Sequence, residues 1–120
     1  MNIVLGVGGA EDSFLALRET VRRTATTGDA LTVAVFDELA DDPDRLEREI
    51  RETLEPHDVR ANIVHLPDDP GPAITELADS EGFDRIVLGG GRRSPMGKIA
   101  LGQVAEFVIL NANTSVTLVR

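Results

Sequence analysis

Short apolar runs alternate along the chain with segments of helical periodicity, and this alternation constrains the fold more than any other feature. After the first run, Phe14, Leu17 and Val21 repeat at the spacing of one helix face. Strands that alternate with helices predict a parallel sheet covered on both faces, because right-handed crossovers place each helix over the sheet. The predicted strands are residues 2–7, 31–36, 59–66, 85–88 and 115–119.

The predicted architecture is α/β, a three-layer α/β/α sandwich around a five-stranded parallel sheet with strand order 3-2-1-4-5. In such sheets ligands bind beyond the carboxyl ends of the strands, where the strand order reverses. With this order the loops after the first and fourth strands flank one crevice. Both loops are rich in glycine, with Gly8-Gly9 in the first and LGGGRRSPMGKIALG (88–102) in the second. We therefore expect the ligand site between these two loops.

The length and composition indicate a single domain over residues 1–120. The absence of cysteine excludes disulfides and thiolate metal sites. No apolar stretch approaches the roughly 20 residues that a membrane-spanning helix needs, and the strand-like start NIVLGV lacks the basic lead of a signal peptide. The expected location is the cytoplasm, without a membrane partner.

The chain is strongly acidic, with 21 aspartates and glutamates against 12 lysines and arginines and a net charge of −9. This charge argues against a nucleic-acid partner, because phosphate neutralisation needs a basic face. Lys98 is the only lysine. Acid enrichment with lysine depletion favours a halophilic source, since salt at about 1 M screens charges beyond roughly 3 Å. The alternative is an ordinary acidic surface that keeps the protein in solution.

The second glycine-rich loop combines five glycines, three cationic side chains and one hydroxyl. Flexible backbone amides beside positive charge predict a cradle for an anion, above all phosphate. The loop is not a P-loop, because Arg92 and Ile99 stand at its first glycine and its metal-binding hydroxyl. The dinucleotide pattern G-x-G-x-x-G after the first strand also fails, at Glu11. The alternative is that the glycines only form the exit from a buried strand and the arginines face solvent.

No catalytic grouping can be assembled, since no nucleophile, base and orienting group fall at matching positions, and no metal ligands are assigned. His65 is predicted to end a strand with its ring at the surface. The carboxylate-rich run DELADDPD (37–44) either binds a cation or is a solvated loop. Asp12 or Ser13 is expected to cap the first helix. These features favour a binding protein over an enzyme.

Three stretches resemble the universal stress protein family: IVLGV (3–7), FDRIVLGG (83–90) and GKIALGQVAEFVILNANTSVTLV (97–119). The resemblance covers the whole chain and implies an adenine-nucleotide alpha-hydrolase-like fold, a role in the stress response and action through binding. Family members carry a nucleotide loop that reads G-x-x-G, nine residues, then G-S or G-T, between the fourth strand and the last helix. They commonly dimerise through the last strand, which is an edge strand in this topology.

The match to this nucleotide loop is partial. Gly89 and Gly102 match its first and late glycines. Arg92 stands at its second glycine, which Gly91 replaces only if the loop holds one extra residue. Gln103 stands where the family has a serine or threonine that donates a hydroxyl to phosphate.

Two further departures follow the first strand, because Gly8 stands where family members carry an aspartate and Ala10 where they carry a serine. Each hydrogen bond to a charged phosphate is worth about 1.5–3 kcal/mol, so these changes weaken the preference for ATP. Arg92, Ser94 and Lys98 can compensate with charge-assisted donors. We therefore expect a site that accepts anions but has lost part of its specificity for ATP.

The resemblance implies a bound nucleotide or small anion, ATP or AMP, with magnesium only alongside ATP. Two alternatives stay open: a ligand-free structural or regulatory dimer of the same fold, and a slow ATPase or phosphotransferase. The predicted homodimer interface is Ser115, Val116, Thr117, Leu118 and Val119. The predicted nucleotide-binding residues are Gly8, Gly9, Phe36, Gly89, Gly91, Arg92, Ser94, Lys98, Gly102 and Gln103.

Overall fold

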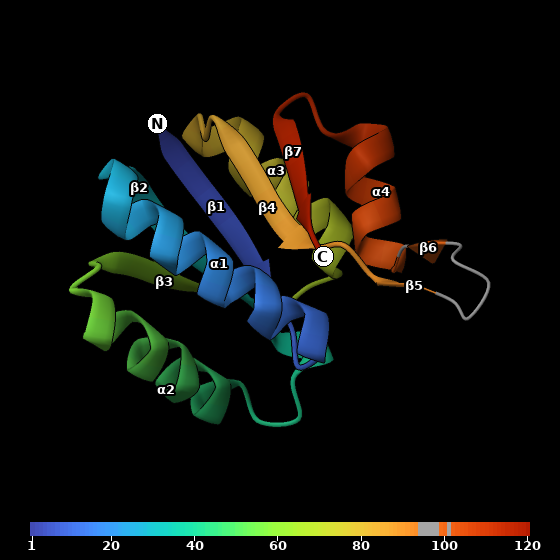
Figure 1. Ribbon diagram of the computed structural model, residues 1–120. Helices are drawn as coiled ribbons and strands as arrows, with labels where there is room; N and C mark the ends of the chain where they lie inside the picture. The colour runs from blue at the N-terminus through green and yellow to red at the C-terminus, as the bar shows by residue number, and fades with distance from the viewer. Residues whose placement is uncertain (94–98, 101) are drawn as a thin grey trace.

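A parallel sheet forms the centre of the molecule (Figure 1). The computed structural model describes residues 1–93, 99–100 and 102–120, and only the backbone of residues 92, 93, 99 and 100. Within this part of the chain the sheet consists of β1 (Asn2–Val7), β2 (Ala30–Phe36), β3 (Ala61–Leu66), β4 (Arg85–Gly89) and β7 (Ser115–Val119). All pairings are parallel and the order is β3-β2-β1-β4-β7. The predicted order 3-2-1-4-5 is confirmed.

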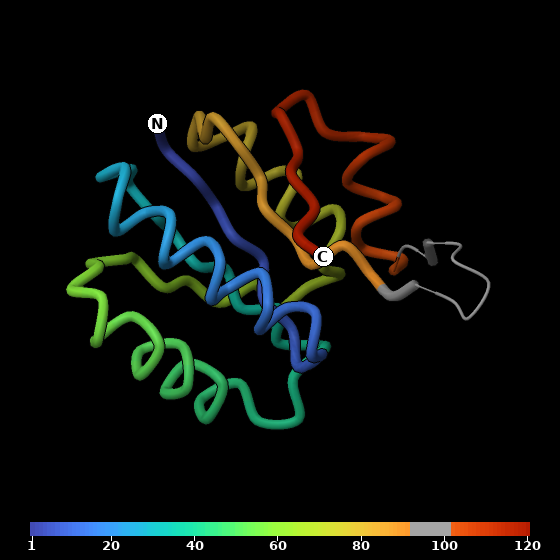
Figure 2. The backbone as a smooth tube through the Cα atoms, in the orientation of Figure 1, coloured from blue at the N-terminus to red at the C-terminus, as the bar shows by residue number. Residues whose placement is uncertain are grey.

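Helices cover both faces of this sheet and complete the three predicted layers, as Figures 1 and 2 show. On one face lie α1 (Glu11–Thr27) and α2 (Pro43–Leu54), and on the other lie α3 (Pro70–Glu81) and α4 (Gln103–Asn111). Two short 3₁₀ turns, η1 (Asp37–Leu39) and η2 (Glu55–His57), follow β2 and α2. In the part of the chain that the structure describes, no helix is long and apolar enough to cross a membrane.

Alternate side chains of the strands enter two separate cores. Ile3, Leu5 and Val7 of β1 face α1 and α2, whereas Val4 faces α3 and α4. All four are at most 6 % exposed. Burial on both faces makes β1 a continuous apolar run, and this is why the run is recognisable in the sequence. Burying one such side chain stabilises the fold by about 1.5–3 kcal/mol.

Several helix ends follow local sequence signals. Pro43 opens α2, and the carboxylate of Asp42 caps it by accepting a hydrogen bond from the backbone N–H of Arg45 at 3.1 Å. Gly28 and Gly82 end α1 and α3 in the left-handed conformation, with φ of 75° and 69°. These boundaries are therefore set by residues within one turn of the helix end.

The start of α1 departs from this rule. The helix begins at Glu11 with Ala10 as its N-cap, and no side chain caps it among the described residues. The prediction that Asp12 or Ser13 caps the helix is wrong. Both side chains instead accept hydrogen bonds from glycine amides of the neighbouring loops, because a short polar side chain can bond to whichever backbone group lies nearest.

The glycine-rich stretch after β4 is not one continuous loop. Arg92–Arg93 (β5) and Ile99–Ala100 (β6) pair as two short antiparallel strands. Two residues are too few to show periodicity, so the sequence does not predict this pair. The predicted ligand contacts of Ser94 and Lys98 lie outside the described residues, and so does the side chain of Arg92.

Candidate functional site

A cavity of about 370 Å³ opens at the carboxyl ends of β1 and β4, within the size range of roughly 300–1,000 Å³ of small-molecule sites. β1 leads to α1 on one face of the sheet and β4 leads to α4 on the other, so the chain diverges at this point (Figure 1). The two glycine-rich loops therefore flank one crevice, as the strand order predicts.

The residues that line this cavity include two sets, which we call the β1 wall and the α4 wall. The β1 wall consists of Gly6, Gly8, Gly9, Phe36 and Leu39. The α4 wall consists of Gly102, Gln103, Val104 and Ala105. Between them the lining is completed by Ala10, Asp12, Ser13, Leu88 and Gly89.

Close packing of side chains on glycine builds the β1 wall. Phe36 is only 3 % exposed, and a Cβ added at Gly6 would stand 2.7 Å from Phe36 Cε2. Leu39 covers the next two glycines. An added Cβ would lie 3.1 Å from Leu39 Cβ at Gly8 and 3.0 Å from the Leu39 carbonyl oxygen at Gly9. The wall is therefore apolar, and it depends on residues without a side chain.

The turn after β1 already uses one of its amides. The N–H of Gly8, a buried residue, donates a hydrogen bond to Ser13 Oγ at 3.1 Å. This bond ties the turn to the first helical turn of α1. The predicted role of Gly8 cannot be exerted through its amide unless the Ser13 hydroxyl moves away.

The carboxylate of Asp12 reaches from α1 to the loop after β4. Asp12 Oδ2 accepts a hydrogen bond from the Gly91 N–H at 3.3 Å. A Cβ added at Gly89 would lie 2.8 Å from this oxygen and 2.8 Å from the Asp12 carbonyl oxygen. Gly91 has a φ of 80°, which glycine adopts without strain. The start of α1 therefore packs directly on the exit of β4, and Gly89 and Gly91 are needed for that contact.

The α4 wall presents the open start of a helix. Gly102 is the N-cap of α4, and no side chain of the described residues caps this end. Its φ is −69°, and within the described part of the chain an added Cβ would meet no atom within 4 Å. Neither its backbone conformation nor packing against the described residues requires glycine at this position. The first amides of a helix carry partial positive charge and bind anions, so the wall suits a negatively charged group.

The segment η1, which carries Leu39 of the β1 wall, is anchored by His65 at the edge of the sheet. His65 Nδ1 lies 2.7 Å from Asp37 Oδ1, and Nε2 lies 2.6 Å from Glu47 Oε1 of α2. Hydrogen bonds to Asp37 and then to Glu47 raise the pKa of His65 above its usual 6.5. Hydrogen bonds from His65 and then Arg51 lower the pKa of Glu47 below 4.5.

The contacts of His65 with Asp37 and Glu47 bear on two predictions. The His65 side chain is only 30 % exposed and is bridged by carboxylates, so its ring is not free at the surface. In the acidic run 37–44, Asp37 binds His65 and Asp42 caps α2. These two acids therefore have structural partners, which favours neither a cation site nor a purely solvated loop.

The cavity gathers most of the predicted ligand residues that the structure describes. Gly91 adjoins it through the hydrogen bond to Asp12. Of the lining residues that the sequence does not predict, Asp12 and Leu39 matter most, because they give the cavity a charge and an apolar cover. The sequence around Asp12 indicates a helix cap, which gives no sign of a place in the cavity. The sequence signal for Leu39 is its position as an isolated large apolar residue in an acidic run. The predicted residues found in the lining are Gly8, Gly9, Phe36, Gly89, Gly102 and Gln103.

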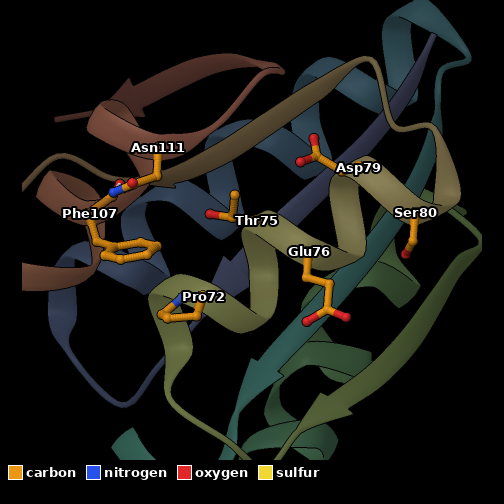
Figure 3. A pocket seen from close by; sticks show the side chains of 7 residues that line it. All are labelled: Pro72, Thr75, Glu76, Asp79, Ser80, Phe107 and Asn111. Carbon is orange, nitrogen blue, oxygen red and sulfur yellow. The ribbon is translucent and has the colours of Figure 1, made fainter.

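A second hollow, of about 540 Å³, lies between α3 and α4 (Figure 3). Glu76 and Asp79 of α3 border it, and Phe107 and Asn111 project from α4. Among the described residues that line it, two are acidic and none is cationic. Like charges repel, so this hollow does not suit an anion.

The predicted dimer strand, β7, forms one edge of the sheet. β4 pairs with it on one side only, with Ile86 opposite Val116 and Leu88 opposite Leu118. The neighbouring helix α4 exposes 44 % of Ile109 and 77 % of Leu110. An open strand edge therefore lies in the same part of the fold as an apolar helix surface.

Comparison with known proteins agrees with this architecture. The family model described as universal stress protein family matches residues 1–120. A universal stress protein from Archaeoglobus fulgidus is 24% identical, with a TM-score of 0.75 over 100% of this chain and 98% of that chain. A universal stress protein in complex with cAMP is 21% identical, with a TM-score of 0.78 over 100% and 96% of the two chains. No curated protein matches the chain.

A further solved structure, the universal stress protein from Archaeoglobus fulgidus in complex with dAMP, is 21% identical, with a TM-score of 0.67 over 100% of this chain and 98% of that chain. At these identities the likeness establishes the fold. The match of the family model to the full chain establishes more: the chain belongs to the universal stress protein family.

Proposed function

We propose that this chain binds an adenine nucleotide or a related anion in the cavity between the β1 and α4 walls. It acts in the stress response through binding and dimerisation rather than catalysis. One observation carries the proposal: an apolar wall and a helix start without a side-chain cap among the described residues line the same cavity. A purine base packs on apolar side chains such as Phe36 and Leu39, and a phosphate binds the first amides of a helix.

The ligands of two similar structures support this assignment. These structures are described as complexes with cAMP and with dAMP. Both molecules join an adenine base to a phosphate, which is the combination of apolar and anionic parts that the two walls suit.

Calorimetric titration with ATP, AMP and cyclic AMP tests the proposal. Because the chain is acidic, the titrations are run at low and at high salt. We expect heat of binding and a rise in melting temperature with at least one ligand, since a ligand at 100 times its Kd stabilises the folded state by about 2.7 kcal/mol. No heat and no thermal shift with any of them would remove the ligand from the function. A mass spectrum of the natively purified protein, searched for co-purified nucleotide, is an independent check.

Restoring the family pattern separates a weakened site from a ligand-free structural dimer. In the double variant, Gln103→Ser adds a hydroxyl at the start of α4, and Gly8→Asp adds a carboxylate beneath Leu39, whose half-exposed side chain can shift to admit it. We expect ATP to bind about tenfold more tightly, the value of one hydrogen bond to phosphate. Absence of binding in this variant would favour the ligand-free dimer, which the engaged amides of Gly8 and Gly91 also allow.

The dimer part of the proposal rests on β7 and α4. The outer edge of β7, residues Ser115 to Val119, offers backbone hydrogen-bonding groups to a second copy of the chain. Exposed Ile109 and Leu110 extend this edge with apolar surface. A two-fold axis beside β7 would bring the same patch of both copies together, as a closed dimer requires.

Sedimentation velocity tests the dimer. We expect a dimer in the wild type and a shift to monomer in Leu110→Glu, because a charge would enter the apolar contact. The matched control is Ala25→Glu at an exposed position of α1, which adds the same charge on the face of the sheet opposite to α4. A wild type that stays monomeric at every salt and protein concentration would remove dimerisation. A phosphate-release assay on the same samples tests the slow ATPase, for which no phosphate release is expected.

A further inference from the structure

One charged side chain lines the cavity among the described residues, and it is the carboxylate of Asp12. Asp12 Oδ2 accepts the hydrogen bond of the Gly91 N–H at 3.3 Å. That amide belongs to the glycine-rich loop after β4, whose amides are the natural donors to an anion. A negatively charged side chain of the protein itself therefore already occupies one backbone donor of this loop.

The fold holds this carboxylate in place. Asp12 lies in the first turn of α1, where the helix dipole favours negative charge. Its backbone and its side chain both pack on the exit of β4, as the 2.8 Å approaches to an added Cβ at Gly89 show. The side chain cannot leave the cavity rim without giving up the Gly91 hydrogen bond.

We propose that Asp12 is a specificity-determining residue that ranks ligands of this cavity by their negative charge. It disfavours nucleoside triphosphates and favours nucleosides and cyclic nucleotides. This inference rests on the proposed function. A phosphate that approaches the Gly91 N–H must displace the carboxylate or lie beside it, and the cost of either rises with the charge of the ligand. Adenosine has no charge and cyclic AMP has a single one, whereas AMP and ATP have more.

A purely structural role for Asp12 predicts a different outcome. If the side chain only holds the loop at Gly91, Asp12→Asn should leave the ranking of ligands unchanged, because the asparagine oxygen can accept the same hydrogen bond. The specificity role depends on the negative charge of Asp12, whereas the structural role depends only on its hydrogen bond. Asp12→Asn removes the charge and keeps the size of the side chain.

The experiment measures dissociation constants of adenosine, cyclic AMP, AMP and ATP for the wild type and Asp12→Asn, by calorimetry in EDTA. We expect Asp12→Asn to bind ATP about tenfold more tightly than the wild type, cyclic AMP only slightly more tightly, and adenosine with unchanged affinity. Raising the salt from about 0.1 M to about 1 M should narrow the gap between ATP and adenosine in the wild type more than in the variant.

The control is Asp44→Asn, which removes the same charge from the exposed first turn of α2, away from the cavity. It should leave all four constants unchanged. An equal change for adenosine and ATP in Asp12→Asn, no change for either, or weaker binding of ATP would overturn the role of Asp12 while the proposed function stands. If no ligand binds to the wild type or to either variant, the proposed function fails, and the inference fails with it.

Discussion

On the β1 wall of the cavity the glycines are covered and an amide is occupied, whereas on the α4 wall the equivalent groups are open. A Cβ added at Gly6 would lie 2.7 Å from Phe36 Cε2, closer than real Cβ contacts allow, and one at Gly8 would lie 3.1 Å from Leu39 Cβ, a tight contact. The Gly8 N–H is bonded to Ser13. A Cβ added at Gly102 on the α4 wall would meet no atom of the described residues within 4 Å, and the helix that begins there has no side-chain cap among them.

This difference separates two uses of glycine in one site. On the β1 wall glycine serves the fold, because packing fills the space that a Cβ would take. On the α4 wall no packing against the described residues requires glycine, so in this part of the structure the backbone is available to a ligand. A glycine-rich loop is therefore not in itself a measure of ligand binding, and the space around each glycine decides which role it has.

The largest effect is expected from Gly6→Ala on the β1 wall. The new methyl would lie 2.7 Å from Phe36 Cε2 and 2.8 Å from Leu88 Cδ2. Both neighbours are buried, so overpacking should lower the free energy of unfolding by about 1–3 kcal/mol. Urea unfolding followed by circular dichroism measures this change.

Phe36→Leu in the same chain provides the check on that explanation. It removes the part of the ring that meets the new methyl, so the double variant should lose less stability than the two single variants added together. A Gly6→Ala protein as stable as the wild type would show that the β1 wall is not tightly packed.

Gly102→Ser is expected to act on the ligand and not on the fold. Serine is a good N-cap and the space is open, so the free energy of unfolding should change by no more than a few tenths of a kcal/mol, about the difference between serine and glycine at this position. The hydroxyl would bond to the amides at the start of α4 and compete with a phosphate, weakening binding by about tenfold. Thermal unfolding and calorimetric titration of one sample measure both effects.

Gly9→Ser makes the same replacement on the β1 wall. It should lower the stability of the fold and have little effect on ligand binding. The Cβ of the new serine would lie 3.0 Å from the Leu39 carbonyl oxygen. This crowding should lower the free energy of unfolding. If Gly9→Ser and Gly102→Ser behave alike, the two walls do not differ in the way described above.

The smallest effect is expected from the histidine that anchors η1 behind the β1 wall. The pKa of His65 is raised in the folded chain, so its contribution is complete below the unfolded value of 6.5 and is lost as the pH rises through the raised pKa. The pKa of Glu47 is lowered, so its contribution is present above 4.5 and is lost as the pH falls through the lowered pKa. The network therefore stabilises the fold most between pH 4.5 and 6.5.

Thermal unfolding of His65→Gln tests this pH window. The wild type should exceed the variant in melting temperature at about pH 5.5, and the difference should shrink at a pH above the raised pKa of His65. The effect is small because the side chains of His65, Asp37 and Glu47 all remain partly exposed to water. His57→Gln, a change of the exposed histidine in η2, is the matched control. If the melting temperatures of the wild type and His65→Gln differ equally at both pH values, the hydrogen bonds of His65 to Asp37 and Glu47 do not stabilise the fold in this way.

Several features of the fold and the site follow from short stretches of sequence. Apolar runs such as residues 2–7 predict buried strands, and their alternation with helices predicts a parallel sheet. The observed order β3-β2-β1-β4-β7 confirms the predicted order 3-2-1-4-5. The same order predicts that the turn at Gly8 and the start of α4 at Gly102 meet at one crevice, and both line the cavity. Pro43 and Asp42 predict the start of α2, because capping is completed within one turn.

Other features could not be predicted because they join distant residues. Leu39 lies in a short turn without periodicity, and its position over Gly8 and Gly9 depends on the path of the chain after β2. His65 meets Asp37 and Glu47 only because β3 lies beside β2 and beneath α2. The pairing of β5 with β6 involves two residues on each side, too few for a sequence signal.

By itself the sequence determined the layers of the fold and the end of the sheet at which the cavity opens, because hydrophobic periodicity and helix-end signals are local and the crossover rule turns them into a topology. Only the tertiary structure decided which glycines are covered and which are open, and where the carboxylate of Asp12 binds. Asp12 and Gly91 are 79 residues apart, and a side chain at the start of a helix bonds to whichever amide the packing of the sheet brings beside it.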